Sequence, residues 1–120
     1  MKKIEVKNVK PYQVPKHFNM VALKLHGKEE TDSQKFWMGL SHFLPGGGAE
    51  LDASPVEKVY FVLEGQVTVI TGTKEKIVLG KWDSIHIGAG EEREIINETN
   101  SPASMLVVIN YPDAAAPQKG

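Results

Sequence analysis

The sequence predicts an all-β domain, a sandwich or barrel of short strands, and three observations support this prediction. Runs rich in β-branched and aromatic residues recur at short spacing along the chain. Glycine (11 residues) and proline (7 residues) interrupt these runs, which is typical of a chain with many turns. No segment shows the hydrophobic period of an amphipathic helix. A length of 120 residues fits one domain.

The first half of the chain is expected to begin with an edge strand and an extended arm over residues 1–16, where short apolar alternation gives way to two prolines. Alternating residues 21–26 predict a strand that a glycine ends, and the polar stretch 28–34 predicts a loop. The aromatic-rich segment 36–44 predicts the next strand. We expect the chain to turn at residues 45–48, because three consecutive glycines continue a strand poorly.

The second half of the chain is expected to contain six further strands. Residues 57–64 are the strongest candidate, since nearly all of the central residues are β-branched or aromatic. The Glu64-Gly65 pair that follows predicts a hairpin to the next strand. The remaining expected strands are residues 66–71, 76–79, 84–87, 93–97 and 104–110. Strands of this length and spacing favour a sandwich or barrel over a mixed fold.

Composition excludes several classes of function. Fourteen Lys and Arg residues balance fifteen Asp and Glu residues, for a net charge of -1, so we expect no nucleic-acid or membrane partner. The absence of cysteine excludes disulfides, thiol nucleophiles and Cys-ligated metals. No apolar run is long enough to span a bilayer, and the start lacks the apolar stretch of a signal peptide. A soluble, cytoplasmic domain is therefore expected.

The spacing of five residues between Gly46 and Gly65 carries the functional signal, where the five are Gly46, Asp52, Ser54, Lys58 and Gly65. Five residues separate Gly46 from Asp52, and Ser54 follows after one more. Three residues then separate Ser54 from Lys58, and six separate Lys58 from Gly65. This frame resembles the first motif of the cupin superfamily, which reads Gly, five residues, His-x-His, three or four residues, Glu, six residues, Gly.

A second stretch resembles the second cupin motif. In the family this motif runs from Gly-Asp through a strand and Pro-x-Gly to a His and, after three residues, an Asn. Asp83, Gly90 and Asn97 match it here, and Arg93 stands where the family has the His. A Trp replaces the first Gly of the motif, and a Gly replaces its Pro.

The resemblance implies a small single-domain cupin, whose fold is a double-stranded β-helix, or jelly-roll barrel. The barrel is expected over residues 34–112. Residues 1–33 are expected to form N-terminal strands and an arm that contacts a second copy, since an exposed sheet edge favours such pairing. Residues 113–120 are expected to form a flexible tail. The resemblance also implies a homodimer.

The metal ligands implied by the resemblance are replaced. In cupins the two His and the Glu of the first motif and the His of the second bind one metal ion. These four positions are Asp52, Ser54, Lys58 and Arg93 in this sequence. Protonated Lys and Arg have no lone pair to give a metal and would repel it. We therefore expect no metal and no other cofactor.

Strand alternation predicts what stands in place of the metal. If Lys58 points into the barrel, Tyr60 does too, and Arg93 joins them from a neighbouring strand. The residues assigned to ligand binding are Asp52, Ser54, Lys58, Arg93 and Asn97. Two arrangements satisfy the buried cations: an anionic ligand completes the pairing, or Asp52 or a neighbouring Glu neutralises Lys58 as a structural plug.

The first interpretation is a metal-independent cupin that binds a small anionic molecule, such as a sugar acid or keto acid, and acts on it as an isomerase or lyase or only binds it. Lys58, as a base or Schiff-base amine, and Tyr60, as a proton donor, are its catalytic candidates. The second interpretation is a metal-dependent enzyme with displaced ligands. Such ligands would come from His42, Glu50, Asp52, Glu57 and His86. The third is a non-catalytic sensor or accessory protein.

Apart from Tyr60, the aromatic residues of the predicted strands and two further histidines are assigned no special role. Aromatic residues on the predicted strands could stack on a sugar ring, but core or dimer packing is the commoner use of such residues. They are Trp37, Phe43, Tyr60 and Phe61. His17 and His26 are interpreted as arm and strand-end residues.

Overall fold

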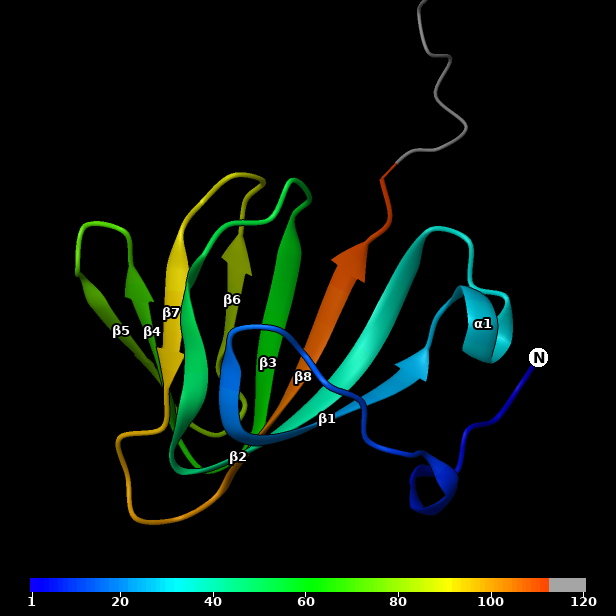
Figure 1. The fold of residues 1–120 in the computed structure, drawn as a ribbon, viewed down its shortest axis with the longest axis horizontal. Coiled ribbons are helices and arrows are strands. Elements are labelled where there is room, and N and C mark those ends of the chain that lie inside the picture. Colours follow the sequence, from blue (N-terminus) through cyan, green and yellow to red (C-terminus); the bar gives the residue numbers. More distant parts are fainter. Residues whose placement is uncertain (113–120) are drawn as a thin grey trace, which may run out of the picture.

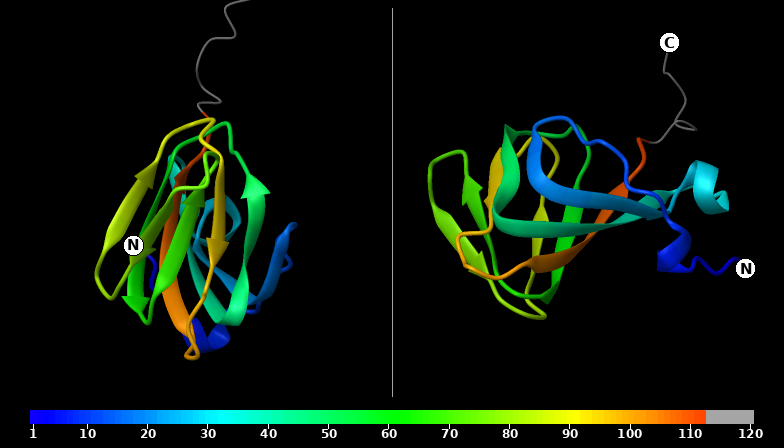
Figure 2. Two further views of the ribbon diagram at one scale, coloured as in Figure 1. Left: turned by 90° about the vertical axis from the view of Figure 1, so that its left-hand side faces the viewer. Right: turned by 60° about the horizontal axis from the view of Figure 1, so that its bottom comes forward.

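The computed structural model describes residues 1–112. Their strands form one strongly curved antiparallel sheet, which closes into a nearly complete barrel (Figure 1). The strands are β1 (His17–His26), β2 (Phe36–Asp52), β3 (Lys58–Glu64), β4 (Val67–Thr71), β5 (Lys76–Leu79), β6 (Ser84–Ile87), β7 (Arg93–Ile96) and β8 (Ala103–Asn110). Seven strands follow the order β5-β4-β7-β2-β8-β3-β6, and β1 pairs with β2. Two further views show how the sheet wraps around its interior (Figure 2). The predicted all-β jelly-roll fold is confirmed.

The longest strand corrects one prediction. We expected a turn at residues 45–48, but β2 runs through them and changes partners, pairing with β1 and β8 before the bend and with β1 and β7 after it. The glycines permit this because both neighbours come very close. A Cβ atom on Gly48 would lie 1.8 Å from the Ile95 oxygen, and one on Gly47 would lie 2.1 Å from the Asn19 oxygen. The glycines are there for close strand contact rather than for chain reversal.

The N-terminal region also differs from the prediction. Residues 1–16 form no strand; they contain a short 3-10 helix at Val6–Asn8 and an isolated bridge between Tyr12 and Ala22. The expected loop at residues 28–34 contains a one-turn helix, α1 (Lys28–Thr31). Hydrophobic periodicity cannot reveal helices of three or four residues, because they have no apolar face to bury.

The predicted hairpin at Glu64-Gly65 is wrong. Strand β3 pairs with β6 and β8, whereas β4 pairs with β5 and β7. Gly65 has a φ of +79°, and its missing Cβ lets the chain pass close to Pro102 and Ala103 as it crosses between the two parts of the sheet. A glycine after a strand thus marks a crossover here.

The core fills one part of the barrel interior and confirms the predicted alternation along β3. Lys58, Tyr60 and Val62 are buried, and Val59 and Phe61 are exposed on the other face. The remaining apolar core residues are Phe43, Ala49, Val67, Val69, Leu79, Ile87, Ile95, Ala103 and Met105. Lys58 is buried in the same interior as this apolar cluster, so the barrel interior also holds a charged side chain.

No helix within residues 1–112 is long and apolar enough to cross a membrane. The tail predicted at residues 113–120 lies outside the described residues.

Candidate binding pocket

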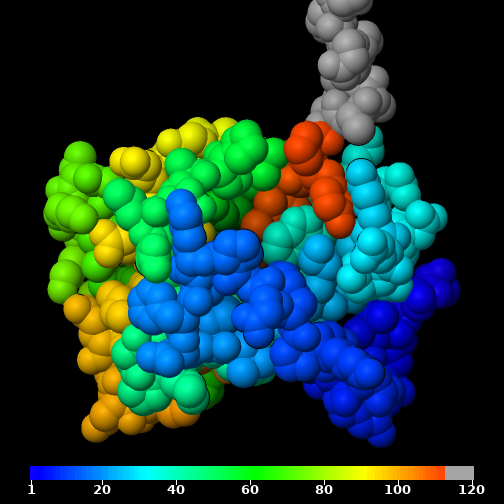
Figure 3. Space-filling view, viewed as in Figure 1, coloured from blue at the N-terminus to red at the C-terminus, as the bar shows by residue number. Residues whose placement is uncertain are grey.

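A cavity of about 300 Å³ lies inside the barrel, next to the apolar core. Its walls come from β1, β2, β3, β7 and β8 and from the chain segment that leads into β1. Figure 3 shows this N-terminal segment lying across the face of the molecule. The polar side chains that line the cavity are Tyr12, His17, Lys24, Ser41, Lys58, Tyr60 and Arg93.

Lys58 enters this cavity from the first position of β3. Its cross-strand neighbours are Ile87 and Ile109, so its aliphatic stem packs among apolar residues and only 5% of the residue is exposed. Burial, and next the positive charge of Arg93, hold the pKa of Lys58 below its usual value. Within residues 1–112 its ammonium group has no carboxylate partner at ion-pair distance.

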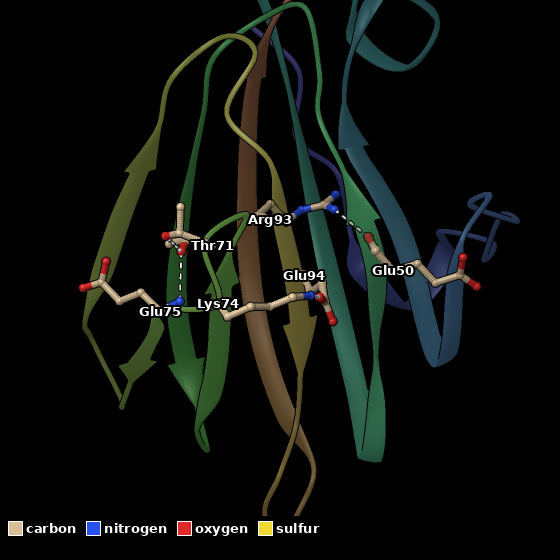
Figure 4. A network of polar contacts seen from close by, with 7 residues as sticks. Glu50, Thr71, Lys74, Glu75, Arg93 and Glu94 are labelled. Carbon is tan, nitrogen blue, oxygen red and sulfur yellow. Dashed lines mark hydrogen bonds and ion pairs between the residues drawn. The ribbon is translucent and has the colours of Figure 1, made fainter.

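Arg93 faces the same cavity from the first position of β7 and is 8% exposed. Its Nε donates a hydrogen bond to the Tyr60 oxygen at 2.8 Å, and its Nη1 donates to the Glu50 backbone oxygen at 3.1 Å. Figure 4 shows the guanidinium directed at that backbone oxygen, while the Glu50 carboxylate points away. The positive charge of Arg93 is therefore held in place by neutral groups.

Tyr60 is the third polar side chain of this part of the cavity, beside Lys58 and Arg93. Burial raises the pKa of Tyr60, although the nearby guanidinium opposes the rise. The phenol therefore keeps its proton at neutral pH. Its oxygen accepts from Arg93, so its O–H remains to donate into the cavity.

The charges that line the cavity have one sign. Lys24, Lys58 and Arg93 contribute three cations, and no Asp or Glu of residues 1–112 belongs to the lining. The overall chain is nearly neutral, so this is a local arrangement. Unpaired charges in a partly dehydrated space are costly, and no carboxylate of the described lining compensates these three.

Asp52 and Ser54 lie outside this lining. The Asp52 carboxylate is exposed, lies 3.6 Å from the Lys16 ammonium and accepts a hydrogen bond from the Ala53 backbone N–H. That backbone bond and Lys16 lower the pKa of Asp52. The Ser54 hydroxyl donates to the Val56 backbone oxygen at 2.8 Å. The structure therefore shows no direct Asp52–Lys58 contact, so Asp52 is not the residue that neutralises Lys58.

Asn97 is fully buried but is occupied elsewhere. Its Nδ2 donates to the backbone oxygens of Phe43 and Ser101, and its Oδ1 accepts from the backbone and the hydroxyl of Thr99. These contacts hold the turn before β8. Asn97 shares a strand face with Arg93, as predicted, yet does not line the cavity.

The residues proposed for a displaced metal site do not converge. His42 lies on the opposite face of β2 and contacts the Ser104 hydroxyl at 2.7 Å. His86 and Glu57 contact each other at the surface, also at 2.7 Å. The Glu50 carboxylate points away from Arg93 (Figure 4), and Glu50 does not line the cavity. No group of three His, Asp or Glu residues in the described part of the chain is arranged to hold a metal ion.

The donor set at the four family positions is also unsuited to a metal. Lys58 and Arg93 supply cationic donors of hydrogen bonds, Asp52 is turned outward, and the Ser54 hydroxyl is bonded to the backbone. The residues present therefore do not fit the metal that the fold family implies.

His17 is a pocket residue that sequence reasoning missed. It pairs with Ala49 across β1 and β2, and its imidazole lines the cavity. The predicted strand began only at residue 21. A register shift between Phe18 and Met20 breaks the alternation that would have assigned His17 to the inner face.

Aromatic residues form part of the wall. Trp37, Phe43 and Tyr60 line the cavity, whereas Phe61 lies on the outer face of β3. A Cβ atom on Gly39 would lie 2.9 Å from the Trp37 ring, so this glycine makes room for the indole.

The barrel and its cavity define a small β-barrel protein with an interior cavity, and comparison with known proteins gives the family. The cupin domain family matches residues 39–109, and the chain belongs to this family. A beta-D-galactosidase of Mycobacterium tuberculosis is 40% identical over 103 residues, which cover 86% of this chain and 88% of the relative.

Two solved structures show the same fold. The polyketide cyclase RemF of Streptomyces resistomycificus has a TM-score of 0.82 at 20% identity, covering 92% of this chain and 79% of that protein. A sugar phosphate isomerase from a cupin superfamily, from Silicibacter pomeroyi, has a TM-score of 0.77 at 18% identity, covering 92% of this chain and 76% of that one. At these identities the likeness concerns the fold alone.

Proposed function

We propose that this cupin binds a small anionic molecule, a sugar acid, keto acid or similar compound, in the barrel cavity without a metal ion. The observation that carries the proposal is the lining itself, in which Lys24, Lys58 and Arg93 meet no carboxylate of residues 1–112. An anion would supply the missing charge.

The cavity offers each kind of contact that an oxyacid needs. The guanidinium N–H groups of Arg93 that are not bonded to Tyr60 or to the Glu50 backbone oxygen can hold a carboxylate or phosphate, and the Lys58 ammonium adds a second charged donor. The Tyr60 O–H adds a neutral donor, or a proton for an isomerase or lyase reaction. Trp37 supplies an apolar wall for the ring or carbon chain.

The name of one relative supports a sugar as the organic part of the ligand. The 40% identical relative is a beta-D-galactosidase. A sugar acid satisfies both the cationic lining and this likeness.

Hydrolysis of a β-D-galactoside is a second candidate, which the 40% identical relative favours. The usual glycosidase mechanism needs two carboxyl groups on either side of the bond that breaks. The cavity lining holds none within residues 1–112, so this reaction would need another part of the surface. Release of nitrophenol from nitrophenyl β-D-galactoside tests it directly.

A thermal-shift screen of carboxylates, sugar acids and sugar phosphates tests the proposed function, because a ligand that binds only the folded state stabilises it by mass action. Hits are expected among the acids, and Lys58→Met should abolish them. Lys81→Met, at an exposed lysine on the surface, is the matched control. No hit among the acids, or hits that Lys58→Met leaves unchanged, would contradict the proposal.

A homodimer forms part of the same proposal. Leu40, Leu106 and Phe61 are cross-strand neighbours on the outer face of β2, β8 and β3, opposite the core residues of these strands. Phe61 is 36% exposed and its neighbour Val59 39%. A second copy packed on this face would bury these side chains.

A further inference from the structure

His17 is held in one orientation by its own backbone neighbours. Its Nδ1 lies 2.8 Å from the Pro15 backbone oxygen. A carbonyl oxygen can only accept, so Nδ1 carries the proton and donates. In the neutral ring, Nε2 is then left with a lone pair, and no hydrogen bond of Nε2 is formed within residues 1–112.

The surrounding charges keep this ring neutral. Burial lowers the pKa of His17, and Arg93 and Lys58 lower it further across the cavity. The Pro15 carbonyl and, more weakly, Asp52 act in the opposite direction. The net lowering leaves an unprotonated Nε2 at neutral pH beside two cations.

The backbone around His17 fixes the ring on the cavity wall. The backbone oxygen of Lys16 accepts a hydrogen bond from Glu50 at 2.8 Å, and the His17 N–H donates to Val14 at 3.3 Å. Lys16 has a φ of 64°, which turns the chain into β1. Hydrogen bonds therefore fix the backbone that carries the imidazole. The residue paired with His17 is Ala49, whose small side chain leaves space for the ring.

The charged groups of the cavity other than His17, and the phenol of Tyr60, act as donors towards a ligand. Lys24, Lys58 and Arg93 only donate, and the Tyr60 oxygen already accepts from Arg93. Apart from the hydroxyl groups of Ser41 and Tyr12, which can either donate or accept, His17 is the lining side chain with an open acceptor among the described residues. A bound molecule that fills this site needs an acid group for the cations and a hydroxyl for the imidazole.

We propose that Nε2 of His17 accepts a hydrogen bond from a hydroxyl of the bound acid, so that the cavity selects hydroxy acids such as sugar acids over acids without hydroxyl groups. This inference rests on the proposed function and narrows its ligand class. It also makes residues 12–17, the segment leading into β1, part of the binding site.

The first experiment tests the ring in the free protein. Two-dimensional proton–nitrogen NMR of histidine-labelled protein should show His17 at neutral pH with a protonated Nδ1 and an unprotonated Nε2. A His17 ring protonated at Nε2 would overturn the inference, because Nε2 could then not accept.

The second experiment compares three probes of similar size by calorimetry: D-galacturonate, cyclohexanecarboxylate and D-galactose. The wild-type protein should bind D-galacturonate best. His17→Leu should weaken D-galacturonate binding on the order of tenfold and leave cyclohexanecarboxylate unchanged. His26→Leu, at a histidine outside the cavity lining, is the matched control.

The outcomes separate this inference from the proposed function. If His17→Leu weakens the binding of both acids equally, or weakens neither, the proposed role of His17 is wrong, while the proposed anion site is not contradicted. Binding of D-galactose alone, lost in His17→Leu, overturns the anion site and supports the hydroxyl contact. No binding of any of the three probes overturns both.

Discussion

The Nε atom of Arg93 donates a hydrogen bond to the Tyr60 oxygen at 2.8 Å, inside the barrel and among almost fully buried side chains. The two residues come from β7 and β3, which are not neighbours in the sheet. This bond therefore spans the cavity and aligns the guanidinium with the space that a ligand would occupy. It is a neutral contact, so it leaves the positive charge of Arg93 available.

Tyr60→Phe should remove this alignment. A buried donor on Arg93 would lose its partner, which should lower the free energy of unfolding by about 2 kcal/mol and weaken the binding of D-galacturonate. Urea denaturation and calorimetry measure the two effects. Tyr111→Phe, where the phenol accepts an exposed backbone bond, is the control and should cost less. Unchanged stability and affinity in Tyr60→Phe would show that the bond has no such role.

The lowered pKa of Lys58 should appear as two opposite pH effects. The free folded state binds this proton more weakly than the unfolded state, so stability should rise as pH increases from the lowered pKa of Lys58 towards the usual lysine pKa of about 10.4. Anion affinity should fall over the same range, because the charged donor is lost. Denaturation and calorimetry from about pH 7 to about pH 10 measure both.

Lys58→Arg is the matched variant for this pH dependence, since arginine stays protonated throughout that range. Its binding curve should lack the alkaline loss. Parallel affinity profiles for the wild-type protein and Lys58→Arg would contradict the role of Lys58.

Asn97→Ala should separate structure from binding. The substitution removes the bonds to Phe43, Ser101 and Thr99, so the free energy of unfolding should fall by about 3 kcal/mol. Affinity for D-galacturonate, measured where the variant is folded, should stay near that of the wild type. Asn100→Ala, at an exposed position of the same turn, should change neither. Stable Asn97→Ala protein with lost binding would restore Asn97 to the ligand site.

The outer face of the sheet should mediate a homodimer. Light scattering after size-exclusion chromatography should give the mass of two chains, and Phe61→Lys should reduce it to one by placing a charge among Leu40 and Leu106. Val78→Lys alters a more exposed residue, at 54%, on β5 and should leave the dimer intact. A wild-type mass of one chain would rule out the homodimer.

Strand alternation was sufficient to predict one half of the pocket. Along β7 and along β3 from Lys58 to Val62, every second residue faces inward, so Lys58, Tyr60 and Arg93 could be assigned to the interior from the sequence. The motif spacing singled out two of these three residues. The structure adds the bond between Arg93 and Tyr60, which depends on how two distant strands meet across the barrel.

The other half of the pocket depends on irregular strand pairing. A register shift lies between Ala49 and Asp52 on β2, and beyond it the Asp52 carboxylate faces solvent. A second register shift, in β1 between Phe18 and Met20, breaks the alternation, so the inward position of His17 cannot be predicted from the sequence. Each shift exchanges inner and outer faces, and no local sequence rule fixes where it falls. Asn97 was placed on the correct face, but its turn contacts could not be foreseen.

The most direct measurement of the central claim compares D-galacturonate with its uncharged methyl ester by calorimetry on the wild-type protein and on Lys58→Met. The account predicts that the acid binds the wild type at least about tenfold more tightly than the ester, as a lost charge-assisted hydrogen bond requires, and that Lys58→Met removes this preference. Equal affinity of acid and ester for the wild-type protein would contradict it.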